Sequence, residues 1–292
     1  MSKELKFRKH RLSAKKTLFH VLIVTLLMMF GYLLSAQLII PLLLITPIRL
    51  FISPMSVELV AYIISSISGL ALLFFYSWWF SPEYKRKPCK TILALRSVAP
   101  IIIYWIVFHG VIRKAVMGEY ASMIYPVTLK ALVSVLVAGI TEELAFREVG
   151  ISYMKRQLRD DKMNLPIILT PSVAFGMIHL YNAVLYRQFT VYAFQAICAF
   201  LLGIFFGSVF LRTGNIWMCM TVHSLHDLLV ALLPVPTTMY DHTAYVYICM
   251  ITGEALLALW GLFLIRKKKH PEIRELWKER WRDKVYDTSS FC

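Results

Sequence analysis

Three apolar stretches of the chain contain ionisable side chains whose types and spacing could support catalysis. They are Glu142, Glu143 and Arg147 in the first stretch, His179 in the second, and His223, His226 and Asp227 in the third. A charged side chain at the centre of a membrane helix costs roughly 2.5–3.5 kcal/mol on insertion scales, so such residues usually mark a functional site. We therefore expect these three stretches to meet at one site.

The spacing of these residues suggests how they pair. Glu143 and Arg147 are four residues apart with the acid first, which is the favoured order for an ion pair along a helix. Adjacent residues of an α-helix are rotated by about 100°, so Glu142 should be free to face a different partner. His223 and Asp227, also four apart, can share a helix face. One structural ion pair explains neither the second acid nor the histidines.

Two kinds of chemistry use glutamate and histidine together. One is a metal site, and the other is a glutamate base that activates water, with histidine assisting and oxyanion donors opposite. The motifs H-E-x-x-H, G-x-S-x-G and G-x-x-x-x-G-K-[ST] are absent, and the five cysteines include no C-x-x-C pair. A hydrolytic Glu/His site remains. Zinc is possible with two histidines and two carboxylates, but we favour a site without metal or other cofactor.

The composition places these stretches in a membrane. The chain has 292 residues, of which 58% are hydrophobic and 17% charged, whereas soluble domains have about 45–50% apolar and ~25% charged residues. We expect an all-α fold, a polytopic transmembrane helix bundle with about eight spans. The eight candidates are residues 18–45, 57–80, 97–112, 124–150, 166–185, 190–211, 215–233 and 245–265.

The net charge of +15 follows from membrane topology. With eight spans, most Lys and Arg residues fall in the segments on one side, so we expect both termini to be cytoplasmic. We therefore expect no nucleic-acid partner, and anionic lipid is expected at the basic tails. In the C-terminal tail, Ile273, Trp277, Trp281 and Val285 recur every four residues. This period predicts an amphipathic helix on the inner membrane surface, with Trp at the headgroups.

The three motifs E-E-x-x-x-R, F-x-x-x-H and H-x-x-x-(N/D), in this order on apolar helices, resemble those of the CPBP (Abi) intramembrane peptidase family. This family includes type II CAAX prenyl endopeptidases and bacterial bacteriocin-processing or immunity proteins. The resemblance covers about residues 130–233. It divides the chain into a basic cytoplasmic tail (1–17), accessory transmembrane helices (18–123), a CPBP-like catalytic core (124–233), a last transmembrane helix (234–265) and a basic amphipathic cytoplasmic tail (266–292).

The resemblance also implies a role for each residue. Glu142 matches the general base that activates water, assisted by His179. The supporting pair corresponds to Glu143 and Arg147. Apart from the resemblance, we expect Phe175 to pack so that it positions the helix beside His179. The oxyanion-binding side corresponds to His223 and Asp227.

The family's third motif often ends in Asn, where this chain has Asp227. An ionised Asp cannot donate a hydrogen bond to an oxyanion. Either Asp227 is protonated in its buried site or it only orients His223. His226 has no counterpart in the motif, and we expect it to pack or to line a polar cavity.

These observations favour an intramembrane endopeptidase, with membrane-associated peptides or lipidated proteins as substrates and a site that opens toward the cytoplasm. The resemblance implies a bacterial plasma membrane. Two alternatives remain: a non-catalytic bacteriocin-immunity or regulatory partner of another membrane protein, and a transporter with a buried proton relay.

Overall fold

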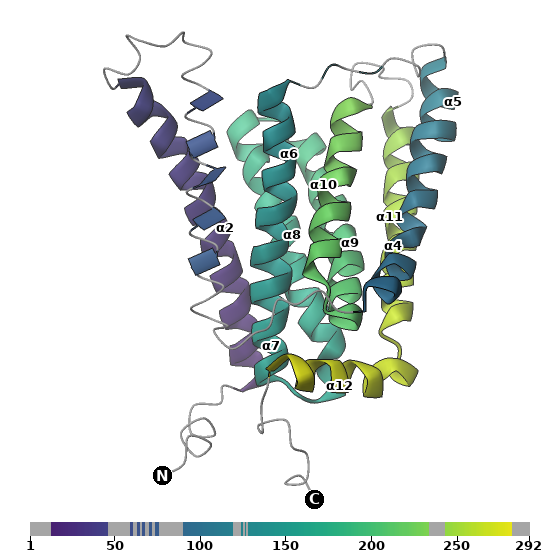
Figure 1. Cartoon of the computed structure of the whole chain (residues 1–292). Helices are drawn as coiled ribbons and strands as arrows, with labels where there is room; N and C mark the ends of the chain where they lie inside the picture. Colours follow the sequence, from purple (N-terminus) through teal and green to yellow (C-terminus); the bar gives the residue numbers. More distant parts are fainter. Residues whose placement is uncertain are drawn as a thin grey trace, which may run out of the picture.

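The computed structural model describes residues 13–45, 90–118, 128–233 and 243–281, together with scattered positions between 59 and 75 and at 124 and 126. All elements in these segments are helical. They are α2 (Ala14–Ile45), α4 (Thr91–Trp105), η2 (Ile106–Ile112), α5 (Arg113–Met117), α6 (Leu129–Glu142), η4 (Glu143–Ile151), α7 (Ser152–Gln157), η5 (Asp161–Met163), α8 (Asn164–Tyr186), α9 (Phe189–Thr213), α10 (Ile216–Leu232), α11 (Thr243–Leu264), η6 (Lys267–Lys269) and α12 (His270–Trp281). The long helices stand side by side, and α12 lies across one end of the bundle (Figure 1).

Five helices in the described part of the chain are long and apolar enough to cross a membrane: Ala14–Leu33, Thr91–Ala115, Asp161–Leu185, Phe189–Thr213 and Ala244–Leu264. Twenty residues of helix extend about 30 Å, the thickness of a hydrocarbon core. The protein is therefore an integral membrane protein with an all-helical fold, as predicted. The predicted span 57–80 lies outside the described residues apart from isolated helical positions, and α10 is a shorter apolar helix.

Side-chain caps and a glycine determine where the site-bearing helices begin and end. The Thr128 hydroxyl accepts a hydrogen bond from the Ala131 amide at the start of α6. Helix α9 ends at Gly214, whose φ of 64° lies in the left-handed region that favours glycine. The next residue, Asn215, caps α10 by accepting from the Met218 amide. Because the turn is this short, α10 begins directly beside the end of α9. Its side chains can therefore reach the core of the bundle.

Helix α9 forms the centre of the bundle and packs against α8 and α11, while α10 packs against α6. The fully buried side chains of α9 include Phe205, Phe206, Val209 and Phe210. The α6–α10 contact is especially close at Gly139, where an added Cβ would lie only 2.8 Å from the Ser224 backbone nitrogen. The absence of a side chain at Gly139 therefore lets α6 and α10 approach directly beside the two acids at the α6–η4 junction.

The amphipathic helix predicted in the C-terminal tail is present as α12, but Trp277 does not lie at a membrane surface. Trp277 is fully buried, and its indole donates a hydrogen bond to the Leu211 carbonyl at 2.9 Å. Arg280 donates to the Gly214 carbonyl. Both carbonyls belong to the C-terminal end of α9, where backbone acceptors have no partners within the helix. The side chain of Trp281 and all of Val285 lie outside the described residues.

An exposed acidic residue connects α12 to the bundle. Glu272 contacts Lys269 in η6 and Arg212 at the end of α9. The Lys269 ammonium and the Arg212 guanidinium lower the pKa of the Glu272 carboxyl from 4.5 to about 2. Docking of α12 therefore includes a contact that depends on ionised Glu272.

Candidate active site

The centre of the site is the imidazole of His223 on α10, which lies between the two neighbouring acids at the α6–η4 junction. Its Nδ1 donates a hydrogen bond to Glu143 Oε1 at 2.8 Å. Its Nε2 lies 3.5 Å from Glu142 Oε2. Glu143 is fully buried and His223 is 3% exposed. One imidazole thus joins both acids across the α6–α10 contact.

The expectation that Glu142 would face away from the partner of Glu143 is wrong. The two carboxylates approach different nitrogens of one ring. Because these nitrogens lie on different edges of the imidazole, two adjacent residues that point in different directions can both reach it. In addition, the α-helix changes to a π-helix at Glu143, and η4 continues to Ile151. A π-helix bonds i to i+5, so the 100° spacing of an α-helix does not apply there. Such segments occur frequently at functional sites.

The ion pair expected from the i, i+4 spacing is present below this ring. Arg147 Nη1 lies 3.0 Å from Glu143 Oε1, and both side chains are almost completely buried. The Arg147 guanidinium also lies over the ring of Phe175, 4.7 Å from its centroid. Glu143 Oε1 thus forms an ion pair with Arg147 and accepts a hydrogen bond from His223. This arrangement fixes the orientation of the His223 ring.

Phe175 joins the second histidine to the site. Its ring contacts His179 edge-on, with the centroids 4.9 Å apart, and also contacts His223 at 5.8 Å. His179 Nδ1 contacts the Phe175 carbonyl at 2.8 Å and so carries the proton, which leaves Nε2 unprotonated in the neutral ring. The described contacts link His179 to the site through Phe175, whereas the direct partner of Glu142 is His223.

The accessible side of the site holds two carboxylates. Asp227 Oδ2 lies 3.8 Å from His223 Nε2, the same nitrogen that faces Glu142. The side chains of Glu142 and Asp227 are 15% and 27% exposed, in contrast to the buried Glu143 and Arg147. The site therefore has a buried part that holds the imidazole and a more open part where water and a peptide bond could meet.

Two aromatic contacts of the site histidines were not predicted from the sequence. Phe206 on α9 stacks on His223 with ring centroids 5.2 Å apart. Trp105 on α4 donates a hydrogen bond to His226 Nδ1 at 3.0 Å. Neither residue stands out from its apolar surroundings in the sequence, and no spacing rule links α4 to α10. Among the described residues, no three His, Cys, Asp or Glu side chains are arranged to hold a metal ion.

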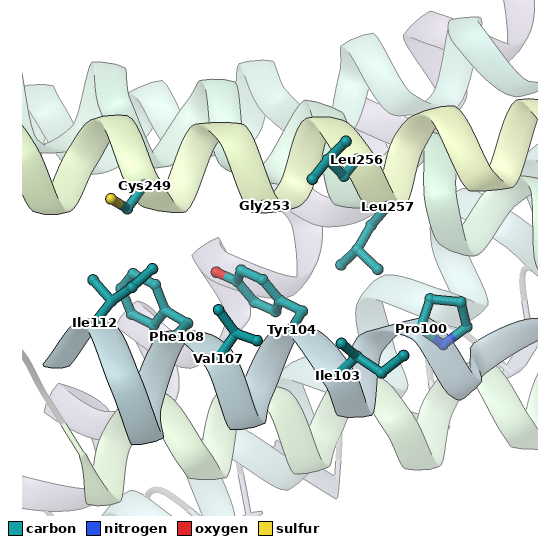
Figure 2. A pocket seen from close by; sticks show the side chains of 10 residues that line it. All are labelled: Pro100, Ile103, Tyr104, Val107, Phe108, Ile112, Cys249, Gly253, Leu256 and Leu257. Carbon is teal, nitrogen blue, oxygen red and sulfur yellow. The ribbon is translucent and has the colours of Figure 1, made fainter. Parts of the chain in front are cut away.

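A separate pocket of about 260 Å³ lies between α4–η2 and α11. Figure 2 shows its side chains, which are apolar except for the hydroxyl of Tyr104 and the thiol of Cys249. The Tyr104 hydroxyl donates to Glu254 Oε1 at 3.4 Å. The Tyr104 ring reaches α11 because Gly253 has no side chain there, and an added Cβ would lie 2.5 Å from the ring. None of the predicted site residues lines this pocket.

Residues 124–229, which carry every predicted site residue, match the family model for type II CAAX prenyl endopeptidases, Rce1-like. The match agrees with the resemblance of the three motifs and supports, at the family level, a membrane peptidase. No curated protein and no solved structure matches the chain.

Proposed function

We propose that this protein is a membrane-embedded endopeptidase that hydrolyses peptide bonds of membrane-associated or lipidated proteins. The observation that carries the proposal is the His223 imidazole held between Glu142 and Glu143, at 3.5 and 2.8 Å. It lies within the segment that matches the Rce1-like family. Buried acids that served only structure would need cationic partners, and Glu143 has one in Arg147. Glu142 instead lies on the accessible side.

In this proposal Glu142 is the general base. A water molecule beside its carboxylate gives up a proton as the oxygen attacks the scissile carbonyl, and the same proton later passes to the leaving amine. Positioned proton transfer of this kind contributes about 10²–10⁴ in rate. The unprotonated Nε2 of His179 is available to orient the water. No acyl-enzyme forms because water attacks directly.

His223, which lies beside Glu142 on the accessible side, would stabilise the oxyanion. Because Glu143 accepts from Nδ1 of His223, Nε2 is the nitrogen that faces the accessible side, and in the protonated ring it donates toward the developing charge. The 3.8 Å separation of Asp227 Oδ2 from Nε2 is too long for a hydrogen bond. At this distance Asp227 makes an electrostatic contact with the protonated His223 ring and not a hydrogen bond, so in this proposal it favours the orientation of the ring by its charge alone.

We also propose that the reaction needs no metal. A catalytic zinc site uses three protein ligands and keeps one position open. Ligation by Glu142, His179 and His223 would remove the base and its assistant from proton transfer. Glu143 could replace the base only by leaving Arg147, which is buried and would lose its ion pair.

The basic cluster after α11 supports a cytoplasmic C-terminus and contact with anionic lipid. The cluster consists of Arg266, Lys267, Lys268 and Lys269, and such groups are attracted to the negative inner leaflet. On the basis of the CPBP resemblance, we also propose that the protein resides in a bacterial plasma membrane.

The test uses purified full-length protein and a quenched fluorogenic peptide that ends in a farnesylated cysteine and three further residues, called here the farnesyl reporter. Membrane peptides from cells are compared in parallel by mass spectrometry. Glu142→Gln should lower cleavage at least 10²-fold while insertion and abundance stay normal. Glu254→Gln is the matched control, because Glu254 is also a buried acid but lies on α11 and contacts Tyr104.

Near-normal cleavage by Glu142→Gln would show that the base is assigned wrongly. If neither the reporter nor any membrane peptide depends on Glu142, the proposed function is wrong. That result would favour a non-catalytic immunity or regulatory partner.

A further inference from the structure

A hydrogen bond connects α4 to α10 one turn beyond His223. The Trp105 indole donates to His226 Nδ1 at 3.0 Å, and the planes of the two rings are nearly parallel, at 13°. The Tyr104 ring contacts the same imidazole, with centroids 6.2 Å apart. His226 is 5% exposed. Because Nδ1 accepts, the proton of the neutral ring is on Nε2, and the bond fixes both its tautomer and its orientation.

The position of His226 places this bond beside the residues that meet Glu142 and Glu143. His226 follows His223 by three residues and directly precedes Asp227. On the other side, α10 contacts α6 where Ser224 packs on Gly139. Helix α10 is therefore held by α6 through a backbone contact and by α4 through one directional hydrogen bond.

The geometry of α10 shows why its rotation matters. Side-chain atoms lie about 5–6 Å from a helix axis, so a rotation of about 10° would move the His223 ring by about 1 Å. The hydrogen bond from Nδ1 to Glu143 is 2.8 Å long. A displacement of this size in either direction would disrupt its geometry. A 1 Å misplacement of a catalytic group can lower a rate by about 10².

We propose that Trp105 and His226 are positioning residues that set the rotation of α10, and thereby hold His223 and Asp227 opposite Glu142. The proposal rests on the proposed peptidase function for its kinetic readout. The CPBP motifs include neither residue. In place of a packing residue or cavity wall, this proposal gives His226 the specific role of fixing the rotation of α10.

The chain offers a matched control for the loss of one indole hydrogen bond. Trp260 on α11 donates to the Ser97 carbonyl on α4 at 2.9 Å. That bond joins α11 to α4 and involves no residue of α10. Substitution of either Trp by Phe removes one indole donor and keeps an aromatic ring, so the general cost to packing is similar.

The experiment measures kcat and KM with the farnesyl reporter. Trp105→Phe should lower kcat about 10- to 100-fold with little change in KM and normal abundance, whereas Trp260→Phe should keep kcat. His226→Asn, whose side-chain oxygen can accept from Trp105, should retain most of kcat, and His226→Phe should not. Equal kcat for the two Trp variants, or equal loss for both His226 variants, would overturn the proposal.

A spectroscopic measurement separates this inference from the proposed function. In full-length protein labelled with ¹⁵N-histidine, Trp105→Phe should shift the ring nitrogens of both His226 and His223, whereas Trp260→Phe should shift neither. This result is expected even if the reporter is not a substrate. Unchanged His223 signals in Trp105→Phe would refute the positioning role, while absence of Glu142-dependent cleavage would refute the peptidase proposal alone.

Discussion

Substitution of Gly139 by alanine should disrupt the site without changing any catalytic group. The new Cβ would lie 2.8 Å from the backbone nitrogen and 2.9 Å from the Cα of Ser224. Carbon atoms in contact are normally about 3.5–4.0 Å apart, so α6 and α10 must separate by roughly 0.6–1 Å at this level. Both helices are continuous through the contact, so neither backbone atom can turn aside as a flexible side chain would.

The separation acts directly on the imidazole. Glu143 lies one turn after Gly139 and His223 directly precedes Ser224, so their 2.8 Å hydrogen bond would lengthen beyond the usual 3.2 Å limit. We expect kcat for the farnesyl reporter to fall about 10- to 100-fold. Overpacking costs typically about 1–3 kcal/mol, so the protein should still insert and accumulate.

Gly150→Ala is the matched control, because a Cβ there would have its nearest neighbours at an ordinary 3.4 Å. Adding Ser224→Ala to Gly139→Ala should not restore activity, since the backbone atoms of residue 224 remain in place. Wild-type kcat in Gly139→Ala, or full rescue by Ser224→Ala, would refute the view that backbone contact between α6 and α10 sets the site geometry.

Three further predictions concern charge and metal. Arg147→Ala should lower abundance more than Glu142→Ala does, because breaking a buried ion pair costs about 3–5 kcal/mol; equal amounts in quantitative membrane blots would contradict this role. Exhaustive chelation should leave reporter cleavage intact, whereas stoichiometric zinc, with activity lost on chelation and restored by readdition, would overturn the metal-free mechanism. Docking of α12 should weaken as pH falls from about 4.5 toward 2, because the lowered pKa of Glu272 means that its stabilising ionised form is lost there. Trp277 fluorescence should report this change, which Glu272→Gln should abolish and Glu275→Gln should leave unaltered; the same pH profile in both variants would refute it.

Much of the site could be predicted because its signals are local in the sequence. Ionisable residues in apolar stretches identified α6–η4, α8 and α10, and the spacing of Glu143 and Arg147 gave their ion pair. The shared imidazole could not be predicted in this way. It depends on the π-helical turn at Glu143 and on how closely Gly139 lets α10 approach, and both are properties of the packed helices.

The sequence predicted helices, but it could not predict which surface the apolar face of each helix would contact. The apolar period of the C-terminal tail correctly indicated a helix, but it could not tell a lipid surface from the apolar end of α9, since both bury the same face. Trp277 packs on protein for this reason. Trp105 and Phe206 were missed because aromatic residues in a membrane helix carry no periodic signal that separates contact with a histidine from contact with lipid.

The π-helical segment from Glu143 to Ile151 also has a consequence for how this chain tolerates length changes. A single-residue deletion inside η4 could return the helix to regular α geometry at little local cost. Because a π-helical turn holds about one residue more than an α-helical turn, such a deletion would leave α7 nearly in phase with α6. The buried Lys155 of α7 would then keep its hydrogen bond to Asn164 at the start of α8. A deletion in the regular part of α6 would instead turn everything after it by about 100° and move it by about 1.5 Å. Away from Glu143 and Arg147, single-residue deletions should therefore be better tolerated inside η4 than in α6.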